Sequence, residues 1–85
     1  MRLDKYLKVS RIIKRRTVAS EAASLGRIQI NGKVAKPSSE VKEGDTLDIL
    51  MGGRHTAVKV MSVQEFTTKA AAAEMYELIS RGGEE

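Results

Sequence analysis

Residues 2–36 read RLDKYLKVSRIIKRRTVASEAASLGRIQINGKVAK, and the hydrophobic pattern changes midway along this stretch. Leu3 and Leu7 lie one helical turn apart, which is the spacing of an amphipathic helix. Ile28 and Ile30 instead alternate with polar residues, as in a strand with one buried face. The stretch therefore predicts helical structure first and antiparallel strands afterwards.

Two short helices are expected in the first part. The first covers residues 2–9, and the second covers residues 18–25, with Thr17 as its N-cap. The second helix is rich in alanine, so another element can pack closely against it. Gly26 is expected to end this helix in a left-handed conformation.

Strands and tight turns follow. Asn31-Gly32 is a strong hairpin signal, because a type I′ turn needs positive φ at both central residues. Gly52-Gly53 marks a second turn. The expected strands are residues 27–30, 33–36, 46–50 and 57–63. A final helix over residues 69–80, capped by Thr67 or Thr68, completes an α+β fold in which a helical hairpin packs on a small bent antiparallel sheet.

The positive charge is concentrated at one end of the chain. Residues 1–36 hold ten basic and two acidic residues, whereas residues 37–85 hold five basic and nine acidic residues. A run of charges is commonly only a solvated surface, but this run has one sign and faces a net-negative remainder. Such a concentration is typical of proteins that bind a phosphate backbone.

The candidate RNA-binding residues follow from this concentration. Arginines are favoured where a phosphate is held in a fork or a base edge is read, and lysines contribute to the field around them. If the patch neutralises roughly five to seven phosphates, log K falls by about 0.7–0.9 per phosphate for each tenfold rise in salt. The candidates are Arg2, Lys5, Lys8, Arg11, Lys14, Arg15, Arg16 and Arg27.

Several classes of function are excluded or disfavoured by composition. The chain has no cysteine and one histidine, His55, so disulfides, thiolate metal sites and histidine-based triads are absent. We identify no nucleophile–base pair or cofactor loop and therefore expect no enzyme, no catalytic residue, no metal and no cofactor. No apolar run approaches the ~20 residues of a membrane span, and we expect a cytoplasmic protein that does not bind membranes.

The kind of nucleic acid can also be narrowed. The chain has only three aromatic residues, too few for stacking platforms along a single strand, so recognition of structured RNA by charge and shape is favoured. A regulatory DNA-binding protein remains an alternative. Against it, residues 18–25 lack the Arg, Asn and Gln side chains that read base edges in a major groove.

Five short segments in order resemble the S4-type RNA-binding domain. They are residues 2–7 (RLDKYL), 14–19 (KRRTVA), 26–32 (GRIQING) and 36–38 (KPS), followed by Val41 with Gly44-Asp45. The resemblance implies an S4-type domain over residues 1–66, with the helix and tail of residues 67–85 packed on it. It also implies that RNA binds the helical hairpin and the loop and strand that follow.

The remainder of the chain resembles one stand-alone branch of that family. Thr67-Thr68-Lys69 and the alanine-rich segment after it are similar to the P-site-tRNA-stabilising factors of bacterial ribosome-associated quality control. This resemblance implies binding to rRNA of the large ribosomal subunit and to P-site peptidyl-tRNA, beside the factor that adds alanine tails to stalled chains. A ribosome-associated monomer is expected.

The alternative within the same family is a heat-shock or ribosome-assembly factor that binds the large subunit through the same surface. The heat-shock S4 proteins carry a longer basic C-terminal extension, whereas the end of this chain is short and acidic.

Overall fold

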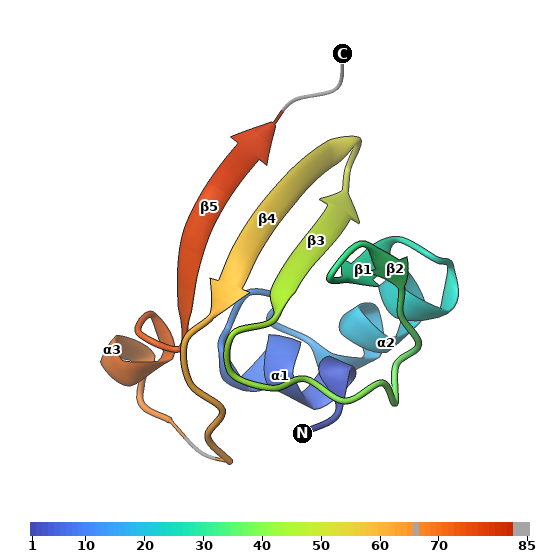
Figure 1. The fold of residues 1–85 in the computed structure, drawn as a ribbon. Helices are drawn as coiled ribbons and strands as arrows, with labels where there is room; N and C mark the ends of the chain where they lie inside the picture. Colours follow the sequence, from blue (N-terminus) through green and yellow to red (C-terminus); the bar gives the residue numbers. More distant parts are fainter. Residues whose placement is uncertain (66, 83–85) are drawn as a thin grey trace.

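The chain folds into one five-stranded antiparallel sheet with a helical hairpin packed at one end (Figure 1). The computed structural model describes residues 1–65 and 67–82. The elements are α1 (Leu3–Val9), α2 (Arg16–Ser24), β1 (Ile28–Ile30), β2 (Lys33–Val34), β3 (Thr46–Met51), β4 (Arg54–Val60), α3 (Lys69–Ala72) and β5 (Tyr76–Gly82). The strand order is β2-β1-β3-β4-β5. The predicted α+β class, with a helical hairpin on an antiparallel sheet, is confirmed.

Helix α1 is fixed at its start by the segment that precedes β3. The amide of Leu3 donates to the carbonyl of Ser39 at 2.8 Å. The amide of Asp4 donates to the carbonyl of Pro37 at 3.1 Å. These bonds satisfy two donors that a helix start leaves open. The first turn of α1 is therefore held against the rest of the domain.

Helix α2 begins earlier than predicted, and Thr17 is not its N-cap. Arg15 occupies the N-cap position with extended backbone (φ −116°, ψ 128°), and its carbonyl accepts a hydrogen bond from Ala19 at 3.1 Å. Thr17 consequently lies inside the first turn, so the prediction was wrong by about half a turn. Gly26 has φ +77°, which confirms the left-handed residue beyond the end of this helix.

The two predicted turns are confirmed, and they fix the register of the strands. Asn31 and Gly32 have φ of 52° and 85°, as a type I′ turn requires, and Ile30 pairs with Lys33 across it. Gly52 and Gly53 also have positive φ, and β3 pairs directly with β4 through this turn. Strand β4 therefore begins and ends three residues earlier than the sequence predicted.

The predicted C-terminal helix over residues 69–80 is wrong beyond its first turn. Helix α3 ends at Ala72, although Thr68 caps it as expected, its side-chain oxygen accepting from the amide of Ala71 at 3.1 Å. The chain then forms β5, which pairs with the outer edge of β4. An open strand edge offers backbone partners that outweigh the helix propensity of a short segment.

The apolar spacing of this segment fits a helix as well as a strand that contains a β-bulge. Ala57 pairs with Ser80 and Val58 pairs with Leu78, which leaves Ile79 as an extra residue in β5. The bulge places Leu78 and Ile79 next to each other in a strand, although their spacing from Met75 also fits a helical stripe. A bulge of this kind bends the strand and increases its twist.

The core lies between α1, α2 and the covered face of the sheet. Leu3, Tyr6 and Leu7 of α1 have no exposed surface, and each such side chain contributes about 1.5–3 kcal/mol by burial. The Tyr6 hydroxyl donates to the carbonyl of Met75 at 2.8 Å, which ties α1 to the start of β5. Tyr6 therefore packs in the core, and burial raises the pKa of its hydroxyl.

The helices that the structure describes within residues 1–65 and 67–82 are all too short or too polar to cross a membrane.

Candidate nucleic-acid interface

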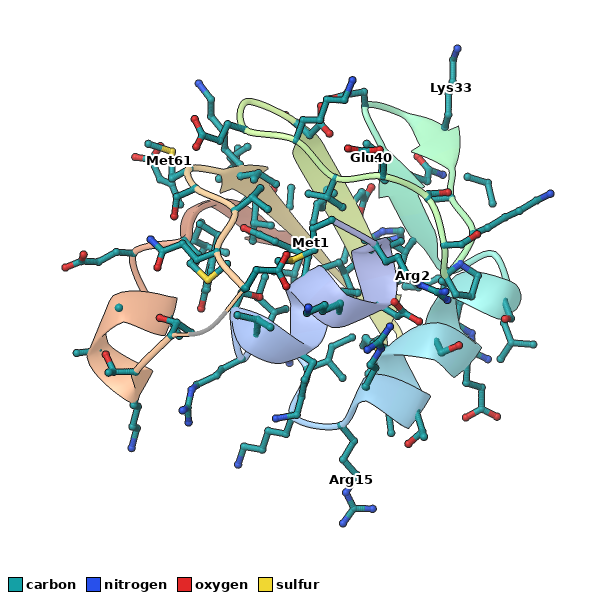
Figure 2. All side chains as sticks on the ribbon, turned by 90° about the horizontal axis from the view of Figure 1, so that it is seen from below. Met1, Arg2, Arg15, Lys33, Glu40 and Met61 are labelled. Atoms are coloured by element: carbon teal, nitrogen blue, oxygen red, sulfur yellow. The ribbon has the colours of Figure 1, made fainter. Side chains whose placement is uncertain are left out.

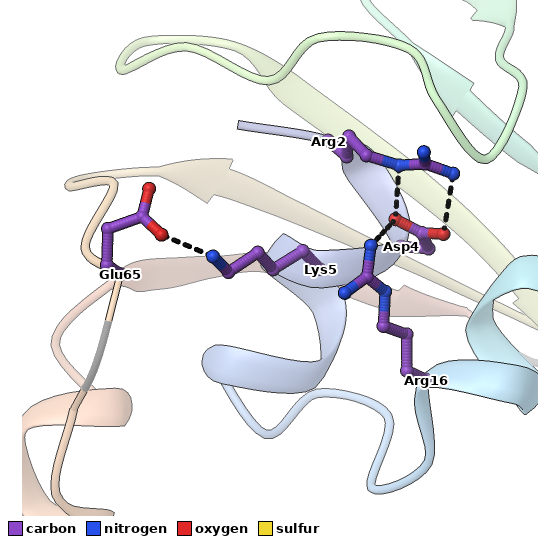
Figure 3. A network of polar contacts seen from close by, with 5 residues as sticks. All are labelled: Arg2, Asp4, Lys5, Arg16 and Glu65. Atoms are coloured by element: carbon purple, nitrogen blue, oxygen red, sulfur yellow. Dashed lines mark hydrogen bonds and ion pairs between the residues drawn. The ribbon is translucent and has the colours of Figure 1, made fainter.

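A buried carboxylate holds two arginines at the start of the helical hairpin (Figure 3). Arg2 donates through Nε to Asp4 Oδ1 and through Nη2 to Asp4 Oδ2, both at 3.2 Å. Arg16, at the start of α2, donates through Nη2 to Asp4 Oδ1 at 3.3 Å. We call these three residues the Asp4 cluster. It joins the first turns of two helices through one acid.

The electrostatics of the Asp4 cluster favour the ionised acid. Burial acts to raise the pKa of Asp4, but the hydrogen bond from Arg2 and the positive charges of Arg16 and Arg2 outweigh it and lower that pKa. The Asp4 side chain is 5% exposed, whereas those of Arg2 and Arg16 are 53% and 46% exposed. Both guanidiniums are therefore fixed from beneath and accessible from outside.

Lys5 is placed differently from the arginines, because it pairs with an acid 60 residues further along the chain. Its ammonium group donates to Glu65, which lies in the segment after β4 (Figure 3). The hydrogen bond from Lys5 and its charge lower the pKa of the exposed Glu65 carboxyl. Lys5 therefore brings less net charge to the surface than the sequence alone implies.

The end of α1 carries a backbone conformation that is unusual for a residue with a side chain. Arg11 has φ +64°, and its amide donates to the carbonyl of Lys8 at 3.0 Å. Glycine commonly takes this position after a helix, because other residues pay about 1–2 kcal/mol in the left-handed region. The long basic side chain is thus kept at a position where glycine fits the backbone better.

A basic groove lies between the end of α1 and helix α3. It has a volume of about 570 Å³ and brings together Lys8, Arg11 and Lys14 with Lys69 of α3. Ser10, Ala72, Ala73 and Tyr76 complete its lining. We call this feature the basic groove. The structure therefore gathers three predicted residues at one place and adds a fourth cation from a distant segment.

The remaining two candidates lie apart from these features. Arg15 is exposed and points away from the body of the protein just before α2 (Figure 2). Arg27 lines a separate hollow beside the β3–β4 turn with Leu50, Gly52 and Gly53. The eight predicted residues are thus divided between the Asp4 cluster, the basic groove and three separate positions.

Sequence reasoning missed two contributors to this surface. Asp4 is not among the predicted residues, and its spacing from Arg2 and Arg16 did not reveal a shared contact. Lys69 was assigned only to the C-terminal helix, and nothing in the sequence places it beside residues 8–14. In both cases the fold brings together residues whose separation along the chain carries no periodic signal.

The fold is shared with known proteins. The S4 domain family matches residues 1–47, which span α1, α2, the β1–β2 hairpin and the start of β3. The chain belongs to the S4 domain family. The match covers the Asp4 cluster and three of the four cations of the basic groove, and it ends before Lys69.

Relatives that match over nearly all of their length show the branch of the family to which this chain belongs. The chain is 56% identical over 80 residues to the "RQC P-site tRNA stabilizing factor" of Streptococcus pneumoniae, covering 94% of this chain and 91% of the relative. It is 53% identical over 79 residues to the protein of that name from Bacillus subtilis, covering 93% and 92%. The chain is a member of the S4 branch that contains these factors.

A solved structure confirms the fold beyond the family match. The heat shock protein 15 of Vibrio cholerae, described as trimeric, superposes with a TM-score of 0.85 at 26% sequence identity. The similarity covers 94% of this chain and 82% of that one. The fold similarity to a heat-shock S4 protein, the alternative within the family, thus extends over nearly the whole chain.

Proposed function

We propose that this protein is a non-catalytic RNA-binding factor of ribosome-associated quality control. In this role it binds rRNA of the large ribosomal subunit together with P-site peptidyl-tRNA. It stabilises that tRNA while a partner factor on the same subunit extends the stalled chain with alanine. The protein works in the cytoplasm as a ribosome-associated monomer.

The Asp4 cluster is the observation that carries this proposal. A guanidinium that is already oriented loses less conformational entropy when it takes a phosphate or a base edge. Arg2 and Arg16 each keep about half of their side chain exposed while Asp4 fixes them. The names of the relatives at 56% and 53% identity support tRNA as one of the bound RNAs.

The proposed role needs geometry and charge rather than chemistry. The S4 domain would place arginines and lysines from α1, the connector and the start of α2 against phosphates of two RNAs. We assign direct contacts to Arg2, Lys5, Arg11, Arg15 and Arg16, supported by Lys8, Lys14 and Arg27. Binding two RNAs through separate parts of one rigid domain would hold the tRNA in a fixed position on the subunit.

Sedimentation of the protein with purified large subunits tests the RNA surface. We expect Arg16→Ala and Arg2→Ala to weaken co-sedimentation several-fold while the thermal unfolding curve remains cooperative. Lys42→Ala, which removes an exposed cation near the β3 start, serves as the control and should bind like the wild type. Unchanged co-sedimentation of both arginine variants would contradict the proposal.

A heat-shock or assembly role is the second candidate, and the structural match to heat shock protein 15 favours it. Affinity purification of the tagged protein from cells separates the two. Large subunits that carry tRNA, nascent chains and the alanine-tailing factor support quality control. Bare or immature subunits without tRNA support the second candidate.

A further inference from the structure

The basic groove joins two parts of the chain that the family match separates. Lys8, Arg11 and Lys14 belong to the matched residues 1–47, whereas Lys69 and Tyr76 lie outside them. Figure 1 shows α3 set apart from α2, beyond the opposite end of α1, at the base of β5. A second surface for RNA is therefore available at the far end of α1 from the Asp4 cluster.

The charge of the basic groove suits phosphate. Four cations line it, and none of the described lining residues is acidic. Lys8 and Arg11 also line the neighbouring hollow, where Glu65 and Thr67 form the other wall. Among the residues that line the two hollows, the acid is Glu65, and it is paired with Lys5.

The groove also contains a half-buried aromatic ring. Tyr76 is fixed at the start of β5, where it pairs with Val60. It lines both the basic groove and a second, mostly apolar hollow whose lining includes Ile12 and Ile13. A ring held by packing on one side offers a surface on which a base can stack. Such stacking accepts any base and changes affinity by about 5- to 150-fold.

We propose that the basic groove holds one unpaired nucleotide of the bound RNA. Its flanking phosphates contact Lys8, Arg11, Lys14 and Lys69, and its base stacks on Tyr76. The volume of about 570 Å³ lies in the usual range of about 300–1,000 Å³ for sites that take a small molecule, which fits a single nucleotide. This inference rests on the proposed RNA-binding function and adds residues outside the S4 domain match.

Two RNA hairpins that differ in one nucleotide test the proposal. One is fully paired in its stem, and the other carries a single bulged nucleotide. Binding of each to the full-length protein is measured by fluorescence anisotropy at several salt concentrations. We expect the wild type to bind the bulged hairpin at least about fivefold more tightly.

Variants of the groove identify the residues responsible. Tyr76→Leu should abolish the preference for the bulged hairpin, whereas Tyr76→Phe should retain it because the ring remains. Lys69→Ala should weaken binding of the bulged hairpin several-fold and reduce the slope of log K against log[salt] by about 0.7–0.9. Lys42→Ala is the matched control. It should change neither the preference for the bulged hairpin nor the affinity for it.

The outcomes separate this inference from the proposed function. If Lys69→Ala and Tyr76→Leu bind both hairpins as the wild type does while Arg16→Ala binds weakly, the groove proposal is overturned and RNA binding stands. If the wild type binds neither hairpin nor large subunits, the proposed function itself fails. If Lys69→Ala instead loses binding only to an acidic peptide such as poly-glutamate, the groove takes a protein and the nucleotide proposal is overturned.

Discussion

Asp4 shows at the scale of one residue how an acid can serve a basic surface. Its carboxylate lies beneath Arg2 and Arg16 and accepts three hydrogen bonds from them. Without it, two guanidiniums would repel each other and sample many rotamers. The carboxylate of Asp4 therefore lowers the net positive charge of the surface by one, but it orients two arginine side chains.

The variant Asp4→Asn should make the stability of the protein depend less on pH in the acidic range. The lowered pKa of Asp4 means that its ionised form stabilises the fold at pH values above the ordinary 3.8. That contribution is lost as pH falls through the lowered value in the folded state. We expect Asp4→Asn to lose about 1–3 kcal/mol of unfolding free energy at pH 7 and progressively less below pH 4, measured by urea denaturation.

The exposed acid Glu43 provides the control for this experiment, because Glu43→Gln removes a charge without touching the Asp4 cluster. It should change stability by less than about 0.5 kcal/mol at either pH. If Asp4→Asn lost the same unfolding free energy at pH 7 and below pH 3, the charge of the carboxylate would not be what holds the two arginines.

At the scale of elements, the end of α1 is the clearest compromise between fold and function. Arg11 adopts φ +64° at a position where glycine is common, and its side chain lines the basic groove. A strained residue of this kind points to a role for its side chain. Stability and RNA binding should therefore respond in opposite directions when Arg11 is replaced.

We expect Arg11→Gly to leave the unfolding free energy unchanged or to raise it by up to about 1 kcal/mol, since glycine adopts positive φ without strain. The same variant should bind RNA several-fold more weakly. Lys8→Gly, inside the last turn of α1, is the matched control for stability alone and should lose about 0.5–1 kcal/mol of unfolding free energy. Chemical denaturation and anisotropy on both variants decide the matter, and a marked loss of stability in Arg11→Gly would refute the idea.

The elements also show how far the sequence could be interpreted. Local signals were sufficient for α1, for the Asn31-Gly32 turn and for the end of α2 at Gly26. They failed for residues 76–82, because the spacing of Met75, Leu78 and Ile79 fits both a helix and a bulged strand. Only the open edge of β4 decides between the two, and that edge exists only once the sheet has formed.

At the scale of the whole molecule, the positive charge does not cover one continuous side. Figure 2 shows Arg15 and Lys33 pointing away from opposite sides of the protein. The helical hairpin carries the Asp4 cluster at one end of α1 and the basic groove at the other. The sequence predicts that residues 2–36 bind RNA, and that remains a prediction. The positions of Lys69 and Glu65 depend on contacts across the domain and carry no local signal.

Glu65 provides a test of this distribution of charge, since its carboxylate neutralises Lys5 and lies next to Lys8 and Arg11. Glu65→Gln should tighten RNA binding about two- to fivefold at 50 mM salt, because the charge of Lys5 is no longer offset and a group that repels phosphate is removed. The gain should shrink by 300 mM salt, as expected for exposed charges. Glu43→Gln, remote from this pair, should show little change in anisotropy titrations. Weaker binding by Glu65→Gln would instead mean that Glu65 orients Lys5 for RNA in the way that Asp4 orients Arg2.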